Sequence, residues 1–138
     1  MKQVLILCTG NSCRSQMAEG FLNAVGKDRF QVSSAGTHPS TVNPLAIEAM
    51  AEINIDISGH SSDGIDAYVN HSFDDVITVC DRAKDNCPVF LARTRMIHWS
   101  FDDPAEAKGT TAEQMLVFRR VRDKIRSKIE SYAKNYME

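Results

Sequence analysis

The sequence lacks any apolar run that approaches the length of about 20 residues needed to cross a bilayer. A short apolar run near the start, Val4-Leu5-Ile6-Leu7, is followed after one residue by polar Thr9 and is shorter than the apolar segment of a signal peptide. These absences exclude a membrane-spanning class and predict a soluble, cytoplasmic protein with no membrane partner.

An excess of charge of one sign is also missing. The 138 residues include 16 basic and 18 acidic side chains, which give a formal net charge of −2. A nucleic-acid-binding surface needs surplus Lys and Arg to neutralise phosphates, so no nucleic-acid partner is expected. Hydrophobic residues make up 43% of the chain, which is ordinary for a globular protein. The length predicts one domain over residues 1–138.

Cysteine is scarce, since the chain holds only Cys8, Cys13, Cys80 and Cys87. Four thiols are too few to predict a disulfide scaffold in a chain of this length. In a reducing compartment they indicate free thiols, metal ligands or catalytic groups. A zinc site is the weakest of these interpretations, because the sequence has no Cys-x2-Cys pair and its histidines are scattered.

Apolar residues alternate between strand-like runs and helical spacing. The strand-like runs predict strands at 4–7, 30–34, 75–79 and 95–99. Helical spacing and capping residues predict helices over 17–25, from 44 to 51, and after the pair Thr110 and Glu113. Alternating strands and helices predict a single α/β domain built on a parallel sheet.

Chemically active side chains follow three of these predicted strands. Cys8 ends the first strand, Cys80 follows the third, and Asp102-Asp103 follow the fourth. Open parallel sheets bind ligands beyond the carboxyl ends of their strands. We therefore expect these side chains to lie along one edge of the sheet.

The segment after the first strand has the composition of an anion-binding loop. It comprises Cys8, Thr9, Gly10, Asn11, Ser12, Cys13, Arg14 and Ser15. A tight turn there directs backbone N–H groups inward, and the start of the next helix adds positive potential. Arg14 can place its planar guanidinium over a tetrahedral oxyanion, and these positive surroundings favour the thiolate form of Cys8. Ser15 can donate to that thiolate, whereas Cys13 is expected to be structural and Ser12 a loop or capping hydroxyl.

The stretch Cys8-Thr-Gly-Asn-Ser-Cys-Arg14-Ser15-Gln-Met-Ala-Glu resembles the phosphate-binding loop of the low-molecular-weight protein tyrosine phosphatase superfamily. It is most similar to the loop of the thioredoxin-coupled arsenate reductases of that superfamily. The resemblance covers essentially the whole chain, including the segment from Cys80 to Cys87 and the run from His98 to Ala105. It implies a four-stranded parallel sheet flanked by helices on both faces.

The resemblance also implies a mechanism. Asp103, which precedes Pro104, corresponds to the acid that protonates the leaving oxygen, although the motif is also that of an acidic turn. In the resembled reductases, residues matching Cys8, Cys80 and Cys87 form a disulfide relay. The first attacks arsenate, the second attacks the first and releases arsenite, and the third attacks the second. Thioredoxin then reduces the final disulfide, so thioredoxin is the expected partner and external reductant, with no tightly bound cofactor.

Two other functions stay open at this point. A phosphatase acting on phosphotyrosine or a small phosphomonoester would share the loop and the acid. Against it, Ala105-Glu106 follow Asp103 and Pro104, where tyrosine phosphatases of this superfamily usually have aromatic residues. A non-catalytic thiol or anion-binding module is the other alternative. For the reductase, arsenate is the expected substrate, phosphate or sulfate are the competing anions, and a monomer is the expected state.

The resembled reductases often bind potassium beside the loop. The residues that match their ligands are Asn11, Glu19, Ser34, Ser61 and Asp63. This oxygen-rich set suits a hard cation, so potassium is an expected ligand. Alternatively, Glu19 is a surface residue of a helix and Ser34 is a hydroxyl at the end of a strand.

One residue departs from the pattern. Many relatives have glycine directly after the second active cysteine, but here Asp81 follows Cys80. Aspartate is less permissive than glycine, and it places a negative charge beside a thiol that must ionise. We expect this difference to affect the rate of the relay rather than the role of Cys80.

Overall fold

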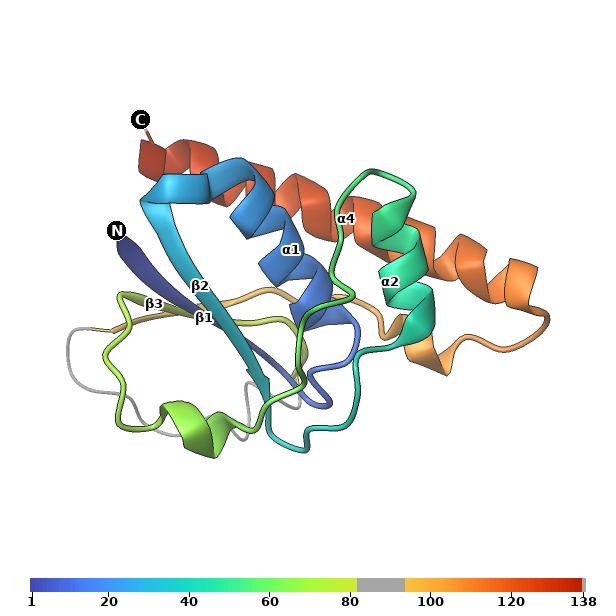
Figure 1. Cartoon of the computed structure of the whole chain (residues 1–138), viewed down its shortest axis with the longest axis horizontal. Coiled ribbons are helices and arrows are strands. Elements are labelled where there is room, and N and C mark those ends of the chain that lie inside the picture. Colours follow the sequence, from blue (N-terminus) through green and yellow to red (C-terminus); the bar gives the residue numbers. More distant parts are fainter. Residues whose placement is uncertain (82–93, 138) are drawn as a thin grey trace.

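A computed structural model describes residues 1–81 and 94–137 as one α/β layer structure (Figure 1). Its sheet has four parallel strands in the order β2-β1-β3-β4. The strands are β1 (Lys2–Cys8), β2 (Phe30–Gly36), β3 (Asp75–Thr78) and β4 (Arg95–His98). The helices are α1 (Arg14–Gly26), α2 (Pro44–Ala51) and α4 (Thr111–Met137), with short 3-10 helices η1 (Lys27–Arg29), η2 (Ile65–Tyr68) and η3 (Pro104–Glu106). The predicted four-stranded parallel α/β fold is confirmed.

Both faces of the sheet are covered. Residues Val4, Leu5, Ile6 and Leu7 of the central strand β1 are all fully buried, as a strand needs to be when layers lie on both sides. The helices α1, α2 and α4 pack against one another, and η2 lies across the sheet from α1 and α4 (Figure 1). The connections β1–β2 and β2–β3 run in opposite directions across the sheet. Right-handed crossovers therefore place α1 and η2 on opposite faces.

Two helix starts follow the capping residues predicted from the sequence. The Asn43 side chain accepts a hydrogen bond from the Leu45 N–H at 2.8 Å, with Pro44 in the first turn of α2. At the start of α4, the Thr110 hydroxyl accepts from the Glu113 N–H at 3.1 Å, and the Glu113 carboxylate accepts from the Thr110 N–H at 3.1 Å. This is the reciprocal capping box that their spacing predicts.

Element ends differ slightly from the predictions. Helix α1 begins at Arg14, three residues before the predicted 17, because the anion-loop residues lead directly into its first turn. Strand β2 continues to Gly36 rather than 34, since its ladder with β1 runs as far as Cys8. Strands β3 and β4 each end one residue earlier than predicted, within the usual uncertainty of element ends.

At the amino ends of the strands, charged side chains form a cluster around Asp75. The buried carboxylate of Asp75 accepts bonds from Lys2 at 3.0 Å, from Arg95 at 3.1 and 3.2 Å, and from the Tyr132 hydroxyl. Burial opposes ionisation, but these donors, Arg95 first, hold the pKa of Asp75 below its ordinary value. Burial and the neighbouring carboxylate raise the pKa of Tyr132. This cluster links the amino ends of β1, β3 and β4 to helix α4.

Within residues 1–81 and 94–137, no helix is both long and apolar enough to cross a bilayer.

Candidate active site

The backbone carbonyl groups of the loop between β1 and α1 accept hydrogen bonds from a neighbouring segment of the chain. Four backbone N–H groups of the segment 37–43 donate to them at 2.8–3.2 Å: Thr37 to Cys8, His38 to Thr9, Ser40 to Gly10 and Asn43 to Ser12. In a trans peptide the N–H points opposite to the C=O. The N–H groups of the next residues are therefore turned toward the inside of the loop, which makes the concave anion site that the sequence predicts.

Asn11 holds the tight turn of the loop. Its φ of 47° lies in the left-handed region, and its side chain is fully buried. The side-chain nitrogen donates to Ser15 at 2.8 Å and to Ser34 at 2.9 Å, and its oxygen accepts from the Asp63 N–H at 2.8 Å. These bonds offset the strain of an unusual backbone angle in a residue type that tolerates it.

The end of strand β2 closes the back of the loop. A Cβ atom at Gly36 would lie 2.5 Å from the Thr9 carbonyl oxygen and 2.8 Å from the Asn11 nitrogen. Both neighbours are backbone atoms and cannot move aside. Glycine is therefore required here for the loop to approach the sheet so closely.

The Cys8 thiol lies on this loop beside the Ser15 hydroxyl. Its sulfur is 2.8 Å from the Ser15 oxygen, and both side chains are buried. Asn11 donates to the same Ser15 oxygen at 2.8 Å, so this hydroxyl is held in place beside the sulfur. The Cys8 sulfur thus lies between a fixed hydroxyl and the inward N–H groups, which is the setting of a nucleophilic cysteine at an anion site.

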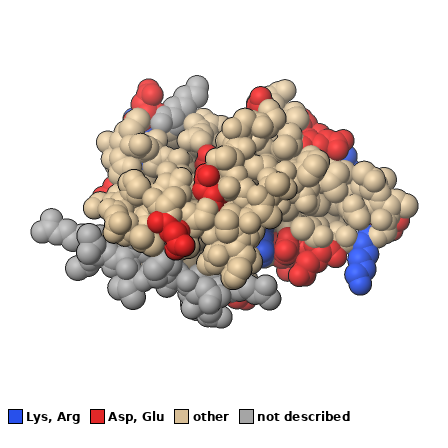
Figure 2. All heavy atoms as spheres, turned by 60° about the horizontal axis from the view of Figure 1, so that its bottom comes forward, with Lys and Arg blue, Asp and Glu red and all other residues tan. Residues whose placement is uncertain are grey.

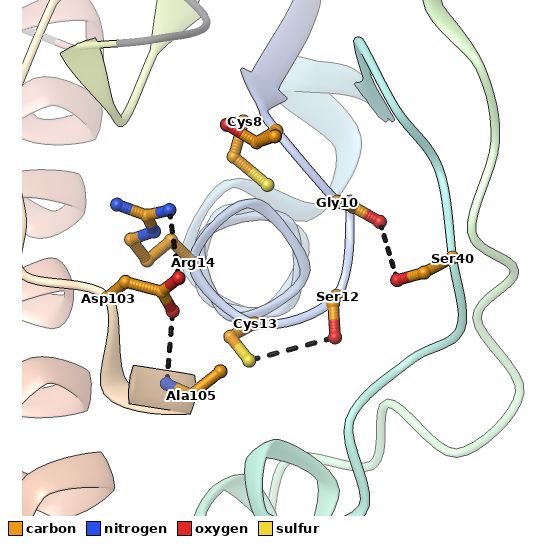
Figure 3. A pocket seen from close by; sticks show the side chains of 9 residues that line it. Cys8, Gly10, Ser12, Cys13, Arg14, Ser40, Asp103 and Ala105 are labelled. Atoms are coloured by element: carbon orange, nitrogen blue, oxygen red, sulfur yellow. Dashed lines mark hydrogen bonds and ion pairs between the residues drawn. The ribbon is translucent and has the colours of Figure 1, made fainter. Parts of the chain in front are cut away.

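Arg14 and Asp103 form the opposite wall of the site (Figure 3). The Arg14 guanidinium donates to the Phe101 carbonyl at 3.0 Å and lies 3.6 Å from an Asp103 oxygen. The other Asp103 oxygen accepts from the Ala105 N–H at 3.0 Å and caps η3. The loop after β4 thus brings an acid group to the anion loop, while the guanidinium keeps further donors for an oxyanion.

These groups line one cavity of about 260 Å³ (Figure 3). Its walls are Cys8, Thr9, Gly10, Ser12, Cys13, Arg14, Ser40, Asp103 and Ala105. The predicted acid and five of the predicted oxyanion-loop residues therefore share one site, whereas Asn11 and Ser15 are fully buried and do not line it. Ala105, which follows Asp103 and Pro104 in the chain, contributes only a methyl group to this wall.

Cys13, which the sequence predicts to be a structural residue of the anion loop, also lies on the wall of this cavity. Burial is the main cause that raises the pKa of Cys13 to about 12, and the Ser12 hydroxyl 3.8 Å away only partly opposes this effect. The thiol is therefore protonated at neutral pH, so Cys13 is a poor nucleophile.

Cys80 lies beside the same loop. Its sulfur is 3.4 Å from the Thr9 hydroxyl, and it lines a neighbouring hollow of about 270 Å³. Thr9, Arg14 and Asp103 line both this hollow and the cavity at Cys8. The structure thus places a second thiol next to the anion site. Cys87, the third predicted thiol, lies outside the described residues.

The expected potassium ligands lie in one hydrogen-bonded cluster behind the loop. Ser34 donates to Glu19 at 2.5 Å and accepts from Asn11 at 2.9 Å, while Asp63 is linked to Asn11 and to Ser61, each at 2.8 Å. The cluster contains two carboxylates together with hydroxyl and amide oxygens, and hard cations prefer oxygen ligands of these kinds. In the part of the chain that the structure describes, no group of three or more His, Cys, Asp and Glu side chains is placed to hold a metal.

Several site residues could not be predicted from the sequence. Ser40 lines the cavity and donates to the Gly10 carbonyl, and Gln16 donates to the Asn11 carbonyl and to the Ser61 carbonyl. His60 adds a bond to the Gln16 side chain at 2.9 Å. None of the three belongs to a local motif, because each contact depends on how distant segments meet.

Charged side chains on one face of the molecule are seen in a space-filling view (Figure 2). On the face shown in Figure 2, acidic side chains are scattered among uncharged ones, and the basic side chains that appear there form no continuous patch. The face drawn there therefore offers no broad positive surface to an anion.

Comparison with known proteins agrees with this geometry. A model of the low molecular weight phosphotyrosine protein phosphatase family matches residues 3–138. The chain belongs to this family. Within it, the chain is 49% identical over 132 residues to an arsenate reductase of Halalkalibacterium halodurans, with 96% of this chain and 95% of the relative covered.

Solved structures of arsenate reductases share the fold over almost the whole chain. One in the oxidized state has a TM-score of 0.85 and 34% identity, and one in the phosphate binding state has a TM-score of 0.79 and 36% identity. Each alignment covers 98% of both chains.

Proposed function

We propose that this protein reduces arsenate to arsenite through a Cys8–Cys80–Cys87 disulfide relay that thioredoxin restores. The observation that carries the proposal is the pair of thiols at one anion loop: Cys8 on the loop and Cys80 bonded to Thr9 of that loop. The arsenate reductases among its relatives support the substrate. A hydrolytic phosphatase would have no use for the second thiol.

The first step is a displacement at arsenic. Loop N–H groups and Arg14 hold the oxygens of arsenate, and the Cys8 thiolate attacks the arsenic atom. A hydroxyl group leaves as water after Asp103 supplies a proton. The product is a covalent bond between the Cys8 sulfur and arsenic(V).

The second step transfers the electrons. Cys80 attacks the Cys8 sulfur as a thiolate, and the electron pair of the sulfur–arsenic bond leaves with arsenic as arsenite. Two thiols are oxidised to a Cys8–Cys80 disulfide while arsenic(V) is reduced to arsenic(III). Cys87 then attacks Cys80, which frees Cys8 as a thiol. Thioredoxin reduces the resulting Cys80–Cys87 disulfide.

Disulfide mapping after one turnover tests this relay. The reduced protein is mixed with one equivalent of arsenate without reductant, alkylated in acid and analysed by mass spectrometry. A Cys80–Cys87 bridge, with Cys8 again alkylatable, is the expected result, because exchange moves the disulfide away from the anion loop. Incubation with phosphate is the control and should leave all thiols reduced. A protein that releases arsenite but holds no Cys80–Cys87 bridge would contradict the relay.

Weak hydrolysis of a small aryl phosphate is a second activity that the site favours. The anion loop, the nucleophile and the acid that such hydrolysis requires are all present around the cavity at Cys8. Water instead of Cys80 would release the phosphoryl group from Cys8. This activity needs neither Cys80 nor Cys87, so it reports on the first step alone.

Potassium bound by the cluster of Asn11, Glu19, Ser34, Ser61 and Asp63 is also proposed, since it would steady the loop from behind. A ligand that binds only the folded state raises the unfolding temperature. We expect the thermal midpoint to be about 2–5 °C higher in potassium than in sodium at equal ionic strength. The Glu19→Gln variant should lose this difference. Equal midpoints of the unaltered protein in the two salts would refute potassium binding.

A further inference from the structure

Cys80 lies between two residues that are bonded to the same imidazole ring. The Thr78 hydroxyl is 2.7 Å from His98 Nδ1, and an Asp81 carboxylate oxygen is 2.8 Å from His98 Nε2. Thr78 ends β3 and His98 ends β4, so the ring spans the two strand ends. The backbone that carries Cys80 is thereby tied to β4 on both sides of the thiol.

The hydrogen bonds that link Thr78, His98 and Asp81 are satisfied in either charge state of His98. A neutral ring donates from Nε2 to the Asp81 carboxylate and accepts the Thr78 hydroxyl proton at Nδ1. A charged ring donates from both nitrogens, and the Thr78 hydroxyl then turns to the Ile97 carbonyl oxygen 3.4 Å away. The bond between Nε2 and Asp81 is present in both states, so the tie to the residue after Cys80 does not depend on protonation of the ring.

The hydrogen bonds of His98 to Thr78 and Asp81, which together form the tie between the Cys80 segment and β4, hold Cys80 toward the anion loop. In this arrangement the Cys80 sulfur faces the Thr9 hydroxyl at 3.4 Å. The backbone is anchored before the thiol as well, since Val79 donates to the Leu7 carbonyl at 2.9 Å. After the thiol, the described anchor is the Asp81 side chain. Its contact with His98 joins the residue after the thiol to the end of β4.

We infer that His98, through Asp81 and Thr78, is a positioning residue for the attack of Cys80 on the Cys8 sulfur. The inference rests on the proposed relay. The Asp81 side chain is 76% exposed and His98 is 25% exposed, so this pair adds little to folding stability and can be released at low cost. Such a tie suits a thiol that first attacks Cys8 and must later turn to Cys87. It also gives the aspartate at position 81 a function that glycine could not have.

Single-turnover kinetics in a Cys87→Ser background isolate this step. The reduced protein is mixed with one equivalent of arsenate, and samples quenched in acid are analysed for arsenite and for the Cys8–Cys80 disulfide. We expect Asp81→Ala to slow disulfide formation about threefold to fivefold, and His98→Ala, which removes both ties, about tenfold. Asp81→Asn keeps an acceptor oxygen for Nε2 and should retain most of the parent rate.

Hydrolysis of an aryl phosphate is the second readout. It uses Cys8 without Cys80, so Asp81→Ala should leave it unchanged, whereas general damage to the fold would lower it. Asp66→Ala, at an exposed aspartate in η2, is the matched control for loss of one negative charge and should behave as the parent.

The outcomes separate the two hypotheses. If the Cys87→Ser parent releases no arsenite and forms no Cys8–Cys80 disulfide, the proposed relay fails. If the parent forms the disulfide and Asp81→Ala forms it at the same rate as Asp66→Ala, the relay stands and the positioning role is overturned. A parallel loss of aryl phosphate hydrolysis in Asp81→Ala would likewise overturn it, because the effect would not be specific to Cys80.

Discussion

Replacing Cys8 by serine should abolish arsenate reduction, lowering kcat by at least about 10⁴-fold. A serine hydroxyl is not ionised at neutral pH, and its oxygen cannot take part in the disulfide that carries the electrons. Hydrolysis of an aryl phosphate should be lost as well, since both activities begin with the Cys8 sulfur. The measurement is arsenite release coupled to thioredoxin, thioredoxin reductase and NADPH.

Phosphate binding distinguishes loss of the nucleophile from loss of the site. The loop carbonyls are held by the segment 37–43, and Arg14 is held by Phe101, so neither depends on the Cys8 sulfur. Calorimetric titration should therefore show that Cys8→Ser still binds inorganic phosphate. Measurable turnover of arsenate by this variant would show that Cys8 is not the nucleophile.

The second large effect is expected for Cys87→Ser, which should release about one arsenite per chain and then stop. The first two steps need only Cys8 and Cys80, so one arsenate is reduced. The Cys8–Cys80 disulfide then remains at the buried site, where both sulfurs are almost inaccessible to another protein. The measurement is the ratio of arsenite to enzyme with thioredoxin as the only reductant.

A small thiol provides the control for this variant. Dithiothreitol can enter a cavity of about 260 Å³, so millimolar amounts should restore turnover to Cys87→Ser, but not to Cys8→Ser. Sustained turnover of Cys87→Ser with thioredoxin alone would show that Cys87 is not needed, and the relay would have to end at Cys80.

Local signals predicted much of this fold. The Asn43-Pro44 pair and the Thr110–Glu113 pair mark helix starts because caps depend on residues within three positions. The apolar run over residues 4–7 marks the central strand for a similar reason: its burial on both faces is visible in its composition. The rule that ligands bind at the carboxyl ends of strands then brought Cys8 and Cys80 to one edge of the sheet.

The rest of the site depends on contacts between distant segments. Nothing near Thr37 or Ser40 in the sequence shows that their N–H groups bind the loop carbonyls. The imidazole of His98 is likewise an ordinary strand-end residue until the register of β3 and β4 pairs it with Thr78. Such pairings are fixed by the packing of the whole sheet, so residue spacing alone does not reveal them.

The outward-facing carbonyls of the anion loop have a consequence for selectivity. A site made from main-chain N–H groups and one guanidinium recognises charge and tetrahedral shape, which phosphate, sulfate and arsenate share. We therefore expect the loop to bind phosphate and sulfate as well as arsenate. Discrimination has to come from the chemical step, since among these anions the arsenic centre is the one that thiols readily reduce. Under the proposed relay, arsenate is selected by how fast it reacts, and phosphate is a competitor that leaves the site unchanged.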